Sequence, residues 1–207
     1  MNDAVQRALA ANPEATCVDF VAHSAGGWLG RAYIGGALND VDWSKKKNTP
    51  VVAKTTVPHP RVRRLVSLGS PHIAPPPGAN DATRGALRWV DETWPGAFFD
   101  GDGDGADGGV KYTCVTGRTV RGVAGPDAKG TLAGYSHNSY IQVCGSGEGV
   151  EGDAVVPNDF AVLDGADNII IDGVFHSMSK VGTYDTAAKD VWYGSEEVVD
   201  LWLGALV

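Results

Sequence analysis

The sequence feature with the clearest chemical meaning is a serine set between small residues, where an apolar run meets a segment with helical character. The pentapeptide Ala22-His23-Ser24-Ala25-Gly26 follows a short β-branched and aromatic run, which predicts a strand, a sharp turn and then a helix. Small residues two positions before and after the serine permit this turn, because larger side chains there would collide. The turn lifts the Ser24 hydroxyl clear of the sheet, and the Ala25 amide at the start of the helix is a candidate oxyanion donor.

A serine needs a base to remove its proton, and the base needs an acid that fixes its tautomer. Among five histidines, His176 is the best candidate base, because it lies directly after the last apolar strand, where open α/β sheets expose reactive groups. His23, as a packing or hydrogen-bonding residue, and His72 are expected to line the pocket. His59 lies between prolines, and His137 lies in a polar stretch that we expect to be a solvated loop.

The acid is expected at Asp153. It lies between a turn-forming glycine and a short apolar anchor in the segment 152–157, an arrangement that would fix a carboxylate at the edge of a site. Asp164, Asp167 and Asp172 remain weaker alternatives, because most aspartates in a chain of net charge −8 serve solubility.

The elements that must position these residues alternate between strands and helices, which predicts an α/β fold with a mostly parallel sheet and flanking helices. Residues 117–152 form a Gly-rich, polar stretch between the third and fourth expected strands. The expected strands are 17–22, 65–68, 110–116 and 168–172, and the expected helices are 3–11, 25–38, 83–93 and 196–206.

The chain length and composition predict a single domain over residues 1–207. Two excursions could form a cap or lid. Residues 39–60 carry three consecutive lysines and three prolines, and residues 73–109 begin with a proline run that must leave the sheet.

Charge and composition exclude several classes of function. Seventeen basic residues against twenty-five acidic ones give a net charge of −8, which argues against a nucleic-acid partner. The apolar stretch 20–30 is too short for an integral membrane span. Three widely spaced cysteines argue against a disulfide framework and a zinc site. The sequence 100–105 fits the opening of a calcium loop, but Lys111 occupies the position of the bidentate glutamate, so we expect an acidic loop and no metal or other cofactor.

Four segments together resemble the lipase and esterase branch of the α/β-hydrolase superfamily: AHSAGG at 22–27, LVSLGSPH at 65–72, GDAVVP at 152–157 and DGVFHS at 172–177. The triad of that family follows the chain order Ser, Asp, His. The resemblance implies that Ser24 is the nucleophile, Asp153 the acid and His176 the base. It also implies a small-molecule acyl ester or lipid substrate and no cofactor.

The chain departs from this family at its start. Only 23 residues precede Ser24, enough for one helix and one strand, whereas family members have several strands there and take a second oxyanion donor from the loop after one of them. The resemblance therefore implies an N-terminally truncated hydrolase with an exposed sheet edge. A targeting segment could be missing with those strands, so the compartment stays open, with a soluble protein of the cytoplasm or a plastid favoured.

The sequence thus predicts a serine hydrolase that cleaves a carboxylic ester through an acyl-enzyme. Two alternatives remain: an acyltransferase that uses the same triad, and a noncatalytic binding protein that retains the fold. The oligomeric state cannot be read from these patterns.

Overall fold

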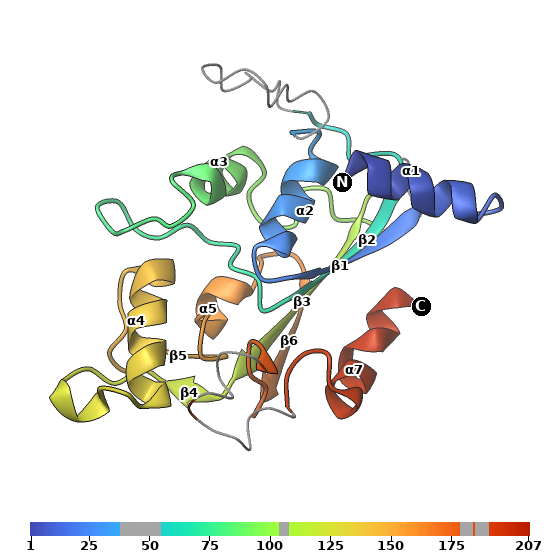
Figure 1. The fold of residues 1–207 in the computed structure, drawn as a ribbon. Coiled ribbons are helices and arrows are strands. Elements are labelled where there is room, and N and C mark those ends of the chain that lie inside the picture. Colours follow the sequence, from blue (N-terminus) through green and yellow to red (C-terminus); the bar gives the residue numbers. More distant parts are fainter. Residues whose placement is uncertain (38–54, 104–107, 179–183, 185–190) are drawn as a thin grey trace.

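The computed structural model describes residues 1–37, 55–103, 108–178, 184 and 191–207. At its centre is a four-stranded sheet in which every pair of neighbouring strands is parallel (Figure 1). This confirms the predicted α/β class with its mostly parallel sheet. The strands, in their order across the sheet, are β1 (Val18–His23), β2 (Val62–Leu68), β3 (Lys111–Arg118) and β6 (Asp167–Asp172).

The register of the sheet brings the carboxyl ends of the strands to one edge. His23 at the end of β1 pairs with Leu68 of β2, and Leu68 pairs in turn with Val115 of β3. Arg118 at the end of β3 pairs with Asp172 at the end of β6. Because all four strands run the same way, the loops that follow them meet at this edge, as expected for an open parallel sheet.

Helices and short elements follow the strands. Two short strands pair antiparallel beside the main sheet: β4 (Val120–Arg121) and β5 (Glu151–Gly152). The chain also contains the 3₁₀ turns η1 (Pro126–Ala128) and η3 (Leu203–Leu206). The α-helices are α1 (Asn2–Ala11), α2 (Gly26–Ile34), α3 (Ala86–Thr93), α4 (Leu132–Cys144), α5 (Asn158–Ala161) and α7 (Glu196–Trp202).

Alternating side chains of the strands pack into two apolar layers. Leu65 of β2 belongs to a core formed with α1, α2 and α3, whereas its neighbour Val66 belongs to a second core formed with α7. This alternation follows from the two-residue period of a strand. The sheet is therefore covered on both faces, with α1, α2 and α3 on one side and α7 on the other (Figure 1). The central strands β2 and β3 are mostly buried on both faces, whereas the edge strands β1 and β6 keep exposed side chains such as Val21 and Ile170.

The expectation that His137 lies in a polar loop was wrong, because residues 117–152 contain the longest helix described, α4. The side chain of Thr131 caps its start by accepting a hydrogen bond from the Gly134 amide, and Gly145 ends it with a φ of 79°. His137 consequently lies on a helix and not in a loop. The polar side chains of α4 hide its periodicity, since they leave no continuous apolar stripe.

Of the two expected excursions, 39–60 and 73–109, the structure describes mainly the second. Most of the first, residues 38–54, lies outside the described residues. The second contains α3 and is fixed to α2 by the buried Arg31, whose guanidinium donates to the carbonyls of His72 and Trp94. Within the described ranges, no helix combines the length and the apolar character needed to cross a membrane.

Candidate active site

Ser24 occupies a strained turn between β1 and α2. Its φ of 55° is unusual for a residue other than glycine, and such strain is often found at functional sites. The turn is held because the Ser24 amide donates a 3.0 Å hydrogen bond to the carbonyl of Leu68 at the end of β2. Ala25 is the N-cap residue of α2, so its amide lies at the positive end of that helix. The structure thus contains the strand, turn and helix that the sequence predicts around Ser24.

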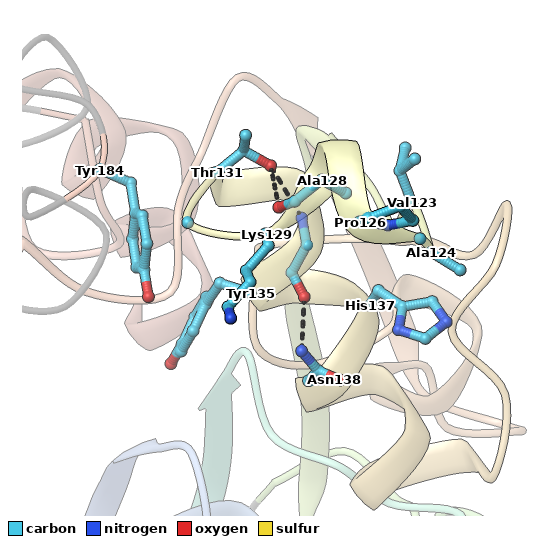
Figure 2. A pocket seen from close by; sticks show the side chains of 13 residues that line it. Val123, Ala124, Pro126, Ala128, Lys129, Thr131, Tyr135, His137, Asn138 and Tyr184 are labelled. Atoms are coloured by element: carbon cyan, nitrogen blue, oxygen red, sulfur yellow. Dashed lines mark hydrogen bonds between the residues drawn. The ribbon is translucent and has the colours of Figure 1, made fainter.

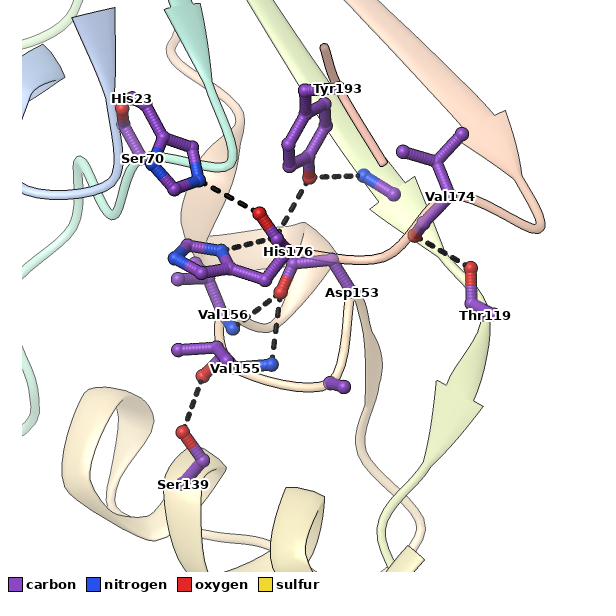
Figure 3. Close-up of polar contacts among 12 residues, drawn as sticks. His23, Ser70, Thr119, Ser139, Asp153, Val155, Val156, Val174, His176 and Tyr193 are labelled. Carbon is purple, nitrogen blue, oxygen red and sulfur yellow. Dashed lines mark hydrogen bonds and ion pairs between the residues drawn. The ribbon is translucent and has the colours of Figure 1, made fainter. Parts of the chain in front are cut away.

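Asp153 and His176 form a buried pair at the same edge of the sheet (Figure 3). The His176 Nδ1 atom lies 2.8 Å from Asp153 Oδ2, and the two side chains are 7% and 0% exposed. The backbone supports the pair, because the His176 amide donates to the Asp153 carbonyl at 2.8 Å. A carboxylate can only accept hydrogen bonds, so Nδ1 of His176 carries the proton in this contact. In a neutral ring the lone pair of Nε2 is then free to accept a proton.

The Asp153 carboxylate receives four hydrogen bonds. Oδ1 accepts from the amides of Val155 and Val156 at 3.0 and 2.7 Å. Oδ2 accepts from His176 and from the Tyr193 hydroxyl, the latter at 2.7 Å. Such a set of donors compensates for the loss of water around a buried charge. The tight loop that makes this possible places Ala154 at a φ of 84°.

Tyr193 is a site residue that the sequence analysis missed. Its ring is completely buried, and its hydroxyl accepts from the Gly117 amide at 2.8 Å while it donates to Asp153. Burial and the adjacent Asp153 charge raise the pKa of Tyr193 well above its ordinary value, so the hydroxyl remains a donor. No motif surrounds Tyr193, and only the fold brings it to Asp153.

His23 connects the serine turn to the candidate base. Its Nε2–H donates to the His176 carbonyl at 2.8 Å, and the two imidazole rings lie 4.5 Å apart (Figure 3). Partial burial, and next the proximity of His176, lower the pKa of His23. The residue next to Ser24 in the chain therefore touches the loop that carries His176.

His72 and the alternative acids lie in other surroundings. His72 is completely buried, and its Nε2 pairs with the Ser67 hydroxyl at 2.9 Å. Burial, and next the charge of Arg31, lower its pKa well below the usual value. Asp167 pairs with Lys111, and Asp172 pairs with Arg118, both through exposed side chains. Of the aspartates considered from the sequence, Asp153 is the one that the structure pairs with His176.

A cavity of about 380 Å³ lies around the amino end of α4 (Figure 2). It is lined by parts of residues 123–138 and by Tyr184, whose ring lies 5.3 Å from that of Tyr135. None of the lining residues belongs to the Asp153–His176 pair. Helix α4 contacts the loop 152–157 that carries Asp153, the acid loop, because the hydroxyl of Ser139 donates to the Val155 carbonyl at 2.9 Å.

Over the described part of the chain, no three His, Cys, Asp or Glu side chains gather closely enough to hold a metal ion. The acidic stretch that opens like a calcium loop falls partly outside the described residues, since 104–107 are not among them.

The chain matches no known protein family, and no curated protein is detectably similar to it in sequence.

Proposed function

We propose that this chain is a serine hydrolase that cleaves a carboxylic ester, with Ser24 as nucleophile, His176 as general base and Asp153 as the acid that orients it. The observation that carries the proposal is the buried Asp153–His176 pair, in which His176 contacts His23, the residue that precedes Ser24 and its strained turn. An acid, a base and a serine on a sharp strand-to-helix turn are the parts that acyl transfer to serine requires.

The chemistry follows from the tautomer of His176. Nε2 takes the Ser24 proton while Oγ attacks the ester carbonyl, and the resulting imidazolium lies against the Asp153 carboxylate. Collapse of the tetrahedral intermediate breaks the bond to the alcohol, which leaves with the proton from Nε2. Water then attacks the acyl-serine with help from the same base, releases the acid and restores the Ser24 hydroxyl.

The negative charge that develops on the carbonyl oxygen needs hydrogen-bond donors. The Ala25 amide at the amino end of α2 is the proposed donor, because helix amino ends present free N–H groups and a partial positive charge. Loss of one oxyanion donor costs about 10²–10³ in rate in well-studied hydrolases. The rate of this chain therefore depends strongly on how many donors meet the oxygen.

Two features support the assignment to the lipase and esterase branch of the α/β-hydrolase superfamily. The proposed residues occur in the chain order Ser24, Asp153, His176, which is the order of that family. The proposed nucleophile and base each follow a strand of one parallel sheet, namely β1 and β6. Convergent triads in other folds have a different chain order.

The direct test is labelling with a fluorophosphonate probe, followed by mapping of the modified peptide. We expect one covalent adduct at Ser24, its loss in Ser24→Ala, and much slower labelling in His176→Ala. Ser146→Ala is the matched control, because Ser146 is an exposed serine that makes no contact with the pair through its hydroxyl, and it should label like the wild type.

A folded protein that stays unlabelled while a reference serine hydrolase reacts would contradict the proposal and favour the noncatalytic binding protein. If Ser24 labels, product analysis with p-nitrophenyl esters in the presence of an added alcohol separates the two enzymatic outcomes. Release of the free acid indicates hydrolysis, and formation of a new ester indicates acyl transfer.

A further inference from the structure

Two buried tyrosines hold the acid loop from different elements. Tyr193 and Tyr140 are both completely buried, and each hydroxyl accepts a hydrogen bond from a backbone amide, from Gly117 at 2.8 Å and from Ala154 at 3.1 Å. They differ in the group to which they donate. Tyr140 donates to the carbonyl of Val120, whereas Tyr193 donates to the charged oxygen that also holds His176.

The position of Tyr193 gives its hydroxyl an electrostatic role. Asp153 Oδ2 accepts from Tyr193 at 2.7 Å and from His176 at 2.8 Å, so the two donors share the negative charge of one oxygen. A donor to the charged form of a carboxylate stabilises that form. The hydrogen bond from Tyr193 therefore weakens the electrostatic attraction between the Asp153 carboxylate and a protonated His176 ring.

We propose that Tyr193 is a positioning residue of the catalytic site: its hydroxyl fixes Asp153 Oδ2 toward His176 Nδ1 and moderates the pull of that carboxylate on the proton of the base. This inference deepens the proposed hydrolase function and depends on it for its catalytic meaning. The backbone supports the role, because the Gly117 amide at the end of β3 fixes the Tyr193 oxygen in the same contact. The raised pKa of Tyr193 agrees with a hydroxyl that stays protonated.

Three other titratable side chains lie near the Asp153–His176 pair, and the variants to be compared must leave them unchanged. His23 approaches from β1, and its pKa is lowered by burial and by His176. Tyr135 and Tyr140 approach from α4, and both sense the Asp153 charge. A substitution at position 193 leaves all three in place.

The test compares Tyr193→Phe with Tyr140→Phe, which removes an equally buried hydroxyl that donates to a backbone carbonyl instead of to Asp153. In Tyr193→Phe, Asp153 pulls harder on the His176 proton. We expect the acidic limb of the kcat/KM profile to move to higher pH by about half a unit, a shift within the range produced by one hydrogen bond to a carboxylate. In Tyr140→Phe, stability falls but the limb stays in place.

A nuclear magnetic resonance titration of the His176 ring gives the same readout without turnover, and its midpoint should move in the same direction. This separates the two proposals: an unlabelled Ser24 with a shifted midpoint overturns the hydrolase alone, and a labelled Ser24 with an unmoved midpoint overturns the role of Tyr193.

If Tyr193→Phe fails to fold, 3-fluorotyrosine at position 193 preserves the contacts with a stronger donor. Its limb and midpoint should then move to lower pH, and no movement again overturns the inference.

Discussion

His72 and His176 are both almost completely buried, and each follows a strand of the same parallel sheet, yet their surroundings have opposite character. His176 faces the carboxylate of Asp153, whereas His72 lies near the guanidinium of Arg31, which donates to the His72 carbonyl at 3.0 Å. Within the described residues, Nδ1 of His72 has no hydrogen-bond partner. Burial, and next the charge of Arg31, make protonation of the His72 ring unfavourable and lower its pKa.

The difference shows that the groups around an imidazole, and not only its place after a strand, determine which protonation state is favoured. The carboxyl edge joins His176 to an acid from a distant loop and leaves one nitrogen for chemistry. His72 also follows a strand, but its side chain is buried in the interior. There, burial and the nearby charge of Arg31 favour the neutral ring. We predict that changes around His176 alter mainly activity and that changes around His72 alter mainly stability.

The largest effect is expected from Asp153→Asn. The amide oxygen can still accept from Val155 and Val156, but its NH₂ group then faces His176 Nδ1. The ring must turn to the other tautomer, which puts a proton on Nε2, so kcat should fall by about 10³–10⁴. Steady-state kinetics on a p-nitrophenyl ester measures the loss.

Asp172→Asn is the control, since the Asp172 carboxylate makes an exposed pair with Arg118. Its kcat should equal that of the wild type. If Asp153→Asn kept more than a tenth of the activity, the role assigned to Asp153 would be wrong.

A smaller effect, on stability, is expected from Gly69→Ala. A Cβ at this position would lie 2.5 Å from Asp153 Oδ2 and 2.6 Å from Tyr193 Cε2, and the backbone has a φ of 53°. Overlap and backbone strain together should cost about 3 kcal/mol or more in the free energy of unfolding. Urea unfolding followed by tryptophan fluorescence measures it.

Gly78→Ala separates the two causes. Gly78 has a φ of 88°, but a Cβ there would meet no atom within 4 Å. Only the backbone cost of about 1–2 kcal/mol remains. Equal losses in the two variants would show that the space around Asp153 and Tyr193 is less restricted than the structure indicates.

The smallest predicted effect concerns pH and His72. Its pKa in the folded protein is lowered well below the ordinary value of 6.5, so below pH 6.5 the unfolded chain binds a proton that the folded chain does not. The free energy of unfolding should therefore fall by up to about 1.4 kcal/mol per pH unit as the pH drops below 6.5, from this residue alone. His72→Gln should remove that part of the slope.

His23→Gln provides the comparison, because the His23 ring is only partly covered and its pKa is lowered less strongly. Its effect on the slope should be smaller. Urea unfolding at pH 7, 6 and 5 measures all three proteins, and an unchanged slope in His72→Gln would contradict the assignment of this pH dependence to His72.

Much of the fold could be predicted from short-range patterns. Three of the main strands were expected from short apolar runs and the third along the chain, 110–116, from its alternation of polar and apolar residues. The segments around Ser24 and His176 were placed after strands because they directly follow two of those apolar runs. Helix α4 could not be predicted, because its sequence from Leu132 to Cys144 is rich in polar side chains. Its start depends on a Thr131 cap, which is a weak signal by itself.

The site was predictable to the extent that its residues lie next to recognisable turns. Asp153 stands in a tight loop and His176 follows a strand, so local sequence marked both. Tyr193 carries no such mark, since its role comes from contacts with Gly117 and Asp153 that only the folded chain creates. His72 shows the converse, because a histidine directly after a strand was expected at the pocket and is enclosed in the interior instead.

The order of these residues along the polypeptide has a consequence for protein synthesis. Ser24 leaves the ribosome long before Asp153 and His176, and Tyr193 follows them. His176 follows strand β6, which pairs with β3, and Trp202 Nε1 of α7 donates to the Tyr193 carbonyl at 2.9 Å. In the proposed mechanism, Ser24 therefore remains an ordinary alcohol until the segments that carry Asp153, His176 and Tyr193 have been synthesised.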